Sequence, residues 1–161
     1  MILNFVILVM ITVQRLGELW LSNANTKRLL AAGAYEVGRA HYPFMIILHG
    51  LWLAALWWYA PWQPINWFWL GIFILLQAAR LWMFFSLGSR WTTRIIILPG
   101  APLVRDGPYR YVNHPNYLIV IGEIASLPLT FGLWKVAVFF SVFNAAILAV
   151  RIREENRALR R

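Results

Sequence analysis

The chain has 161 residues, of which 61% are apolar and only 13% are charged, and its mean hydropathy of +0.62 excludes an ordinary soluble domain. Its formal net charge of +9 raises the possibility of an acidic partner. Cysteine is absent, which excludes disulfides, thiolate metal sites and cysteine nucleophiles. The composition therefore indicates an integral membrane protein.

Apolar windows along the chain predict membrane helices. A helix rises about 1.5 Å per residue and the hydrocarbon core is about 30 Å thick, so a span needs about 20 apolar residues. The first segment has no basic leader or cleavage motif, and we interpret it as an uncleaved span. Five segments fit and predict an all-α membrane bundle in a single domain over residues 1–161, namely 2–21, 44–60, 67–87, 117–131 and 134–150.

The last two predicted spans are separated only by Thr130 to Gly132, so they form a tight helical hairpin. The fourth is short and carries Pro128 near its end, which leaves open whether both members of the hairpin cross the membrane fully.

Lysine and arginine are retained on the cytoplasmic side of membrane proteins. Here they gather in the linkers after spans one and three and in the C-terminal tail, whereas only Lys135 lies in the opposite linkers. We therefore expect the N-terminus outside and the C-terminus in the cytoplasm. Basic residues beside membrane spans favour contact with anionic lipid heads over binding of nucleic acid.

Polar residues inside the predicted spans indicate a buried layer, because ionisable groups in a membrane need a partner or a function. Arg15 and Glu18 are three residues apart on one helix face and can pair. Each of four polar residues lies about 10 Å from the cytoplasmic end of its span: Arg15, Arg80, Glu123 and Asn144. The pattern predicts a polar pocket just below the cytoplasmic surface. A network that only holds the helices together explains the spacing equally well.

The linker between spans three and four, residues 88–117, contains four of the eight prolines. Proline fixes φ, so we expect an extended, stiff loop that can bind a ligand with little loss of entropy. His114 precedes Pro115 and is pushed out of the helical region, which makes Asn116 the expected N-cap and Tyr117 the first residue of the next helix. His41 and His49 are remote and have no ligand-like spacing, so no metal site is predicted.

The tail from Arg151 to Arg161 extends the last span as a helix of mixed charge. Arg151 and Glu155 are four residues apart and share a face, and Glu154 lies three residues from both Arg151 and Arg157. Surface ion pairing by itself explains this pattern.

Two motifs carry a resemblance to a known family. The segment LPGAPLVRDGPYRYVNHPNYL (residues 98–118), followed by RIREENRAL (residues 151–159), resembles the isoprenylcysteine carboxyl methyltransferase superfamily over about residues 91–159. The earlier segments VQRLGEL and HYPFMIILH are similar to short bacterial members associated with methylation of alkylpyrone or alkylresorcinol lipids made by type III polyketide synthases. The resemblance implies a protein of the bacterial inner membrane that uses S-adenosylmethionine, with membrane lipids and a lipophilic acceptor as partners.

Carried over by residue, the resemblance implies a cofactor site and a catalytic arginine. Arg151 would face the acceptor, and Asn113 stands where the family has an arginine, a role that Arg110 could take instead. Four residues are candidates either for binding the acceptor or for the polar layer: Arg110, Arg80, Glu123 and Asn144. The implied cofactor-binding residues are Ala101, Pro102, Leu103, Val104, Tyr109, His114, Pro115, Asn116, Tyr117 and Glu155.

The predicted reaction is methyl transfer to an anionic oxygen, a carboxylate or an acidic enol or phenol, which needs alignment more than a strong base. The chain has no G-x-G-x-x-G turn, so the cofactor fold differs from that of soluble methyltransferases. Two alternatives stay open: a membrane NAD(P)H-dependent reductase related to sterol reductases, and a lipid-binding or scaffold protein without catalytic activity.

Overall fold

The computed structural model describes residues 1–102 and 104–159. It is a bundle of five α-helices, which confirms the all-α membrane fold, together with one small sheet. The helices are α1 (Ile2–Ala31), α2 (Tyr42–Tyr59), α3 (Trp67–Leu87), α4 (Pro115–Thr130) and α5 (Trp134–Leu159). The strands are β1 (Tyr35–Val37) and β2 (Ile95–Ile97), and short 3₁₀ turns cover Arg39–His41, Gly88–Arg90 and Gly107–Arg110.

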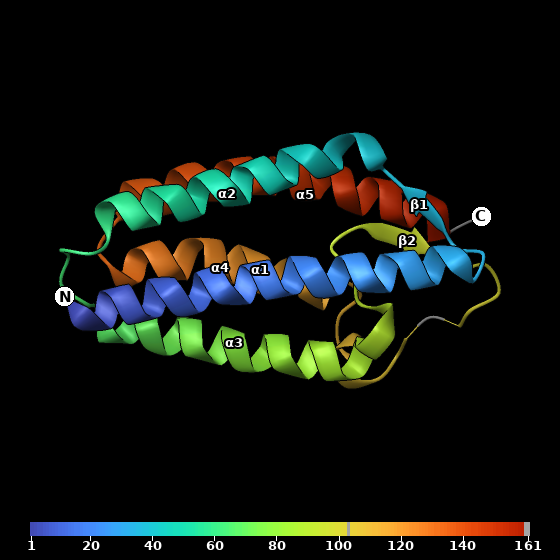
Figure 1. The fold of residues 1–161 in the computed structure, drawn as a ribbon, viewed down its shortest axis with the longest axis horizontal. Coiled ribbons are helices and arrows are strands. Elements are labelled where there is room, and N and C mark those ends of the chain that lie inside the picture. The colour runs from blue at the N-terminus through green and yellow to red at the C-terminus, as the bar shows by residue number, and fades with distance from the viewer. Residues whose placement is uncertain (103, 160–161) are drawn as a thin grey trace.

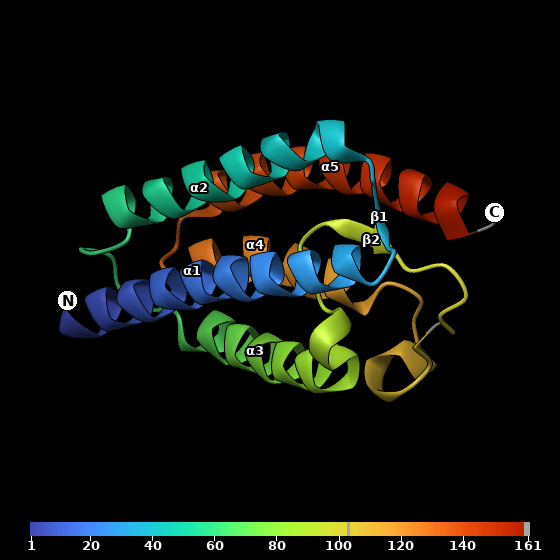
Figure 2. The same cartoon turned by 45° about the vertical axis from the view of Figure 1, so that its right-hand side comes forward.

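Successive helices run up and down along the long axis, so the two chain ends lie at opposite ends of the bundle (Figure 1). The helix α4 packs against both α3 and α5, and α2 packs against α5. In both views the sheet, the long linker and the C-terminal end of α5 gather at the same end of the molecule (Figure 2). This clustering places the two motifs of the sequence side by side.

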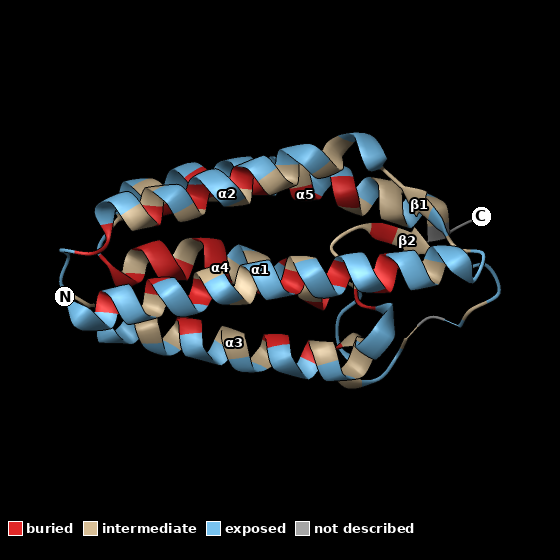
Figure 3. Cartoon of the chain, viewed as in Figure 1, coloured by how far each residue is buried: buried red, intermediate tan, exposed pale blue. Residues whose placement is uncertain are grey.

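Four helices, α1, α2, α3 and α5, are long and apolar enough to cross a membrane. The helix α4 has 16 residues, which corresponds to about 24 Å, less than the hydrocarbon thickness of about 30 Å. It is the most heavily buried helix, whereas the outer faces of the others expose large apolar side chains (Figure 3). The short α4 is thus an inner helix, the outcome that the hairpin pattern left open.

The helix α1 continues ten residues beyond its predicted end at Leu21. Small polar side chains of this extension are buried against the long linker: Ser22 Oγ lies 2.7 Å from Thr93 Oγ1, and Asn25 Nδ2 donates to the Trp91 carbonyl over 2.8 Å. Hydropathy does not register such contacts, which explains the shorter prediction.

The start of α4 also differs from the prediction. The helix begins at Pro115, with His114 at the N-cap position, and Asn116 lies within the first turn. The expected Asn116 cap was wrong because proline is itself favoured at the first helical position, where its missing N–H costs nothing.

The sheet was not predicted, since its two strands have only three residues each. They pair antiparallel, with Glu36 opposite Ile96, and Arg94 Nη1 lies 3.0 Å from Glu36 Oε1. The sheet therefore ties the connection between α1 and α2 to the long linker.

Gly107 sets how closely the linker approaches α3. Its φ is +58°, and a Cβ there would lie 1.9 Å from Ser86 Oγ and 3.3 Å from Trp82 Nε1. A left-handed conformation costs an L-residue roughly 1–2 kcal/mol.

We expect Gly107→Ala to lower the Tm in detergent by about 2–8 °C. Gly71→Ala is the matched control, because no other part of the described chain beyond its own helical backbone lies within 4 Å of the added Cβ. Equal Tm values for the two variants would contradict the close packing of the linker on α3.

Candidate active site

Two cavities lie near the linker end of the bundle. The outer cavity, about 1080 Å³, is bounded by β2, the proline-rich linker and the last turns of α5. The inner cavity, about 230 Å³, lies within the bundle between α1, α2, α4 and α5. The outer one is as large as the largest typical small-molecule sites, which occupy roughly 300–1,000 Å³.

Most of the residues predicted to bind the cofactor line the outer cavity. Pro115 is buried as the first residue of α4 and does not line it, and Leu103 lies outside the described residues. The predicted residues that do line it are Ala101, Pro102, Val104, Tyr109, Arg110, His114, Asn116, Tyr117, Arg151 and Glu155. Their individual roles stay predictions.

Hydrogen bonds join the start of α4 to the end of α5 across this cavity. The Tyr117 hydroxyl donates to Glu155 Oε2 over 2.6 Å, and His114 Nδ1 lies 3.4 Å from the same oxygen. The His114 ring stacks on Tyr117 with centroids 5.3 Å apart. In the linker, Arg90 Nη1 donates to the Pro102 carbonyl over 2.8 Å. The proline-rich linker and the tail helix thus form one wall.

Charge in the outer cavity is unevenly distributed. Glu155 is the one acidic residue among the described residues that line it, whereas five arginines do so: Arg90, Arg94, Arg105, Arg110 and Arg151. Burial, and then the negative charge of Glu155, raise the pKa of Tyr109, so its phenol stays a neutral hydrogen-bond donor at physiological pH. The cavity suits a ligand that carries both an anionic group and positive charge.

Arg151 does not take part in the surface ion pairs that the tail suggested. It is only 4% exposed, its Nη2 donates to the Thr93 carbonyl over 2.9 Å, and its Nη1 lies 3.3 Å from Met45 Sδ. Its guanidinium also lies 5.6 Å from the Tyr117 ring centroid. Glu155 bonds Tyr117 instead, so within residues 1–102 and 104–159 no carboxylate pairs with this buried cation. Its Nε is also buried without a partner there.

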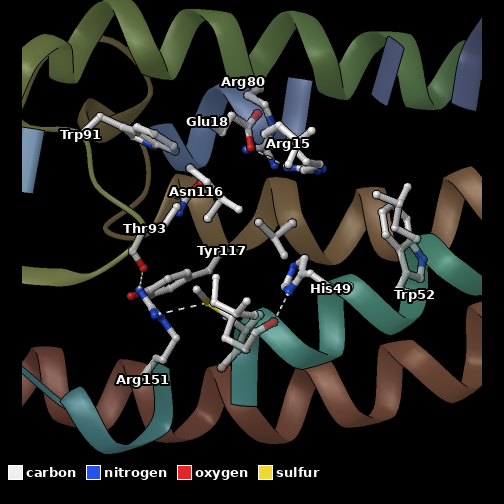
Figure 4. Close-up of a pocket in the computed structure, with 18 of the residues that line it drawn as sticks. Arg15, Glu18, His49, Trp52, Arg80, Trp91, Thr93, Asn116, Tyr117 and Arg151 are labelled. Carbon is white, nitrogen blue, oxygen red and sulfur yellow. Dashed lines mark hydrogen bonds and ion pairs between the residues drawn. The ribbon is translucent and has the colours of Figure 1, made fainter. Parts of the chain in front are cut away.

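The inner cavity, shown in Figure 4, shares four lining residues with the outer cavity. Three of their polar atoms, Asn116 Oδ1, Trp91 Nε1 and Arg151 Nε, are buried and have no hydrogen-bond partner in the described chain. Unpaired buried polar atoms are rare in folded proteins, and these atoms are available to bind a ligand or water. The shared residues are Trp91, Asn116, Tyr117 and Arg151.

The inner cavity is mainly apolar and reaches the outer face of the bundle between α1 and α2. Leu16 on α1 and Gly50 on α2 both line it and are exposed. Figure 4 shows Arg151 and Tyr117 at one end of this cavity and Trp52 at the other. In a membrane, this opening would face lipid tails.

A network of ion pairs stands beside the inner cavity. Glu123 accepts hydrogen bonds from Arg15 Nη2 over 2.7 Å, from Gln77 Nε2 over 2.8 Å and from Arg80 Nε over 2.7 Å. Glu18 Oε2 lies 2.8 Å from Arg15 Nη1 and 3.3 Å from Arg80 Nη1. Three members of the predicted polar layer are thus brought together.

Asn144, the fourth predicted member of the layer, is fully buried but separate. No hydrogen bond joins Asn144 to the network in the part of the chain described, and its Oδ1 is left without a partner. Similar depth in the membrane did not imply contact, because helices at one level can turn their polar residues in different directions.

Several residues of the inner cavity were missed as site residues, among them Met45, His49, Trp91 and Thr93. Met45 and His49 belong to the segment HYPFMIILH, where only the resemblance drew attention. Thr93 contributes its backbone carbonyl, a group that any residue type carries, so the sequence offered no signal for it.

The fold and the site define an integral membrane protein in which a polar cavity at one end of the bundle shares lining residues with an apolar cavity inside it. The profile of the isoprenylcysteine carboxyl methyltransferase (ICMT) family matches residues 69–161. The chain therefore belongs to this family of membrane methyltransferases.

Two curated proteins resemble nearly the whole chain. The uncharacterized protein YpbQ of Bacillus subtilis is 39% identical over 96% of this chain and 95% of its own length. An uncharacterized protein of Haemophilus influenzae is 30% identical over 90% of this chain and 88% of its own length. No solved structure shows a significant match.

Proposed function

We propose that this protein transfers a methyl group from S-adenosylmethionine to an anionic oxygen of a lipophilic acceptor, either a carboxylate or an acidic enol or phenol. The observation that carries the proposal is the buried guanidinium of Arg151, which has no carboxylate partner among the described residues and lies where the two cavities meet. A buried charge is costly unless it is compensated, so the site favours an anionic ligand.

The donor set of the outer cavity fits S-adenosylmethionine, which carries a sulfonium, an amino group, a carboxylate, a ribose diol and an adenine. Arginines would bind the carboxylate, the unpaired Asn116 Oδ1 would accept from an N–H, and Glu155 would oppose the sulfonium charge. When bound, this donor supplies an electrophilic methyl group.

The residues of the chain then act by alignment and charge. Arg151 would bind the acceptor oxygen through charge-assisted hydrogen bonds. These bonds would keep the oxygen ionised and hold it beside the residues that line both cavities. The apolar lining of the inner cavity would exclude water and accept the hydrocarbon part, which enters between Leu16 and Gly50. Such positioning of two reactants can account for about 7–11 kcal/mol of a barrier.

The same proposal includes the orientation of the protein in the membrane. The outer cavity is at the C-terminal end of the bundle, which the distribution of basic residues assigns to the cytoplasm, where a soluble methyl donor is available. The N-terminus would then face outward across the bacterial inner membrane.

Calorimetry in detergent tests the proposed cofactor. We expect binding of S-adenosylmethionine and S-adenosylhomocysteine but not of NADPH, and binding of NADPH alone would favour the reductase instead.

The variant Glu155→Gln tests the role proposed for this carboxylate. It should weaken the binding of S-adenosylmethionine about tenfold, which equals about 1.4 kcal/mol. The binding of S-adenosylhomocysteine should weaken less, because only S-adenosylmethionine carries a sulfonium. Glu154→Gln, the neighbouring acid that does not line the cavity, is the matched control. Equal losses for both ligands would refute the pairing of Glu155 with the sulfonium.

A further inference from the structure

Two neutral groups hold the guanidinium of Arg151. Its Nη2 donates to the Thr93 carbonyl over 2.9 Å, the contact drawn in Figure 4, and its Nη1 lies 3.3 Å from Met45 Sδ. A carboxylate in place of the carbonyl would also orient the guanidinium, but it would neutralise the charge. The carbonyl therefore orients Arg151 and leaves its positive charge for a ligand.

A carbonyl can orient a guanidinium only if the carbonyl itself is fixed. Thr93 lies outside the helices, two residues before β2, so no helical ladder holds its backbone. Three hydrogen bonds hold it instead. Its N–H donates to Ser22 Oγ over 2.8 Å, and its Oγ1 lies 2.7 Å from Ser22 Oγ and 2.9 Å from the Tyr42 hydroxyl oxygen. A hydroxyl donates once and accepts twice, so Thr93 Oγ1 can serve both neighbours.

Both hydroxyl partners of Thr93 are themselves anchored. Ser22 is fully buried in α1. Tyr42 is the first residue of α2, and the guanidinium of Arg94 lies 4.4 Å from the centroid of its ring. Arg94 in turn pairs with Glu36 of β1. Contacts from α1, α2 and the sheet thus converge on one residue of the linker.

We propose that Ser22, Thr93 and Tyr42 are positioning residues for Arg151. Their hydroxyl groups fix the backbone of Thr93, and its carbonyl then holds the guanidinium that lines both cavities. This inference rests on the proposed function, in which Arg151 holds the acceptor oxygen. Ser22 and Tyr42 precede residue 69, where the family match begins. The first two helices would thus position a side chain of the last.

The variant Thr93→Val tests the role of the hydroxyl, because it keeps the carbonyl and the shape of the side chain. We expect turnover, measured with radiolabelled S-adenosylmethionine and membrane lipid extract, to fall about tenfold, since small displacements of an aligning group slow a reaction strongly. Calorimetry should show unchanged affinity for S-adenosylhomocysteine, since Thr93 is not among the described residues that line the outer cavity. Ser22→Ala and Tyr42→Phe should reproduce the loss, and Thr93→Ser, which keeps the hydroxyl, should restore most of the turnover.

Thr130→Val is the matched control. It removes the hydroxyl of another buried threonine, which donates to the Ser126 carbonyl over 3.0 Å at the far end of α4, and it should leave turnover unchanged. A double-mutant cycle separates positioning from a merely structural effect. In the Arg151→Met background, Thr93→Val should cause little further loss, because the group that Thr93 positions is gone. A structural role would lower turnover by the same factor in both backgrounds.

Nitrogen NMR of the protein labelled with ¹⁵N-arginine measures the positioning without turnover. The Arg151 signals are those that disappear in Arg151→Met, and their line shapes give the rate at which the guanidinium rotates about its Cζ–Nε bond. Rotation should be about tenfold faster in Thr93→Val than in wild type or Thr93→Ser, since the hydrogen bond to the carbonyl is loosened. Tm reports the folding of every variant.

Equal rotation rates in wild type and Thr93→Val, or an equal loss of turnover in both backgrounds, would overturn the positioning role. If the wild-type protein transfers no methyl group, the proposed function fails, and the rotation rate alone still decides whether these hydroxyl groups position Arg151.

Discussion

Replacing Arg151 with methionine should lower kcat/KM for the acceptor by about 100- to 1000-fold and leave the affinity for S-adenosylhomocysteine nearly unchanged. The reason is that Arg151 carries the buried positive charge that has no carboxylate partner in residues 1–102 and 104–159, so its removal deletes the group proposed to hold the anionic oxygen. Methionine keeps much of the side-chain volume beside Met45 and Tyr117. Turnover is measured with radiolabelled methyl donor and membrane lipid extract, and affinity by calorimetry.

Two further variants sharpen this experiment. Arg151→Lys keeps the charge but loses the planar fork, so its activity should fall between those of wild type and Arg151→Met. Arg153→Met removes an exposed arginine two residues along the same helix and should behave as wild type. If Arg151→Met instead abolished binding of S-adenosylhomocysteine and Arg153→Met did not, Arg151 would belong to the cofactor and not to the acceptor.

Replacing Glu123 with leucine should destabilise the bundle more than any other change considered. Glu123 is 1% exposed and accepts hydrogen bonds from Arg15, Gln77 and Arg80, so its loss leaves buried charge uncompensated. Breaking a buried ion pair by removing one partner costs about 3–5 kcal/mol. We expect Tm in detergent to fall by about 10 °C or more.

A double substitution separates charge balance from packing. Arg80→Leu together with Glu123→Leu leaves the Arg15–Glu18 pair, which is neutral by itself. The double variant should therefore be more stable than Glu123→Leu alone, a coupling that a double-mutant cycle measures. Asn144→Leu is the control outside the network and should cost little, since it removes a buried oxygen that has no partner among the described residues. A double variant less stable than both single variants would show that shape, not charge, dominates at this site.

The sequence by itself determined the class of protein and the positions of its helices. The start of α3 at Trp67 and of α5 at Trp134 agree with the predicted limits, because long apolar runs can be satisfied only in lipid and only as helices. The paired motifs at residues 98–118 and 151–159 also carried the family, which the match over residues 69–161 confirms.

The tertiary structure alone decided where the polar side chains point. The four-residue spacing of Arg151 and Glu155 allows a surface ion pair, yet packing of α5 against α2 and the linker turns Arg151 inward to Thr93 and Met45. Equal depth likewise placed four residues in one predicted layer, yet Asn144 has no hydrogen bond to the other three in the described chain: Arg15, Arg80 and Glu123. Hydropathy and spacing describe one helix at a time, whereas the rotation of each helix about its axis depends on neighbours far away in the chain. That rotation decides which polar groups meet each other and which remain for a ligand.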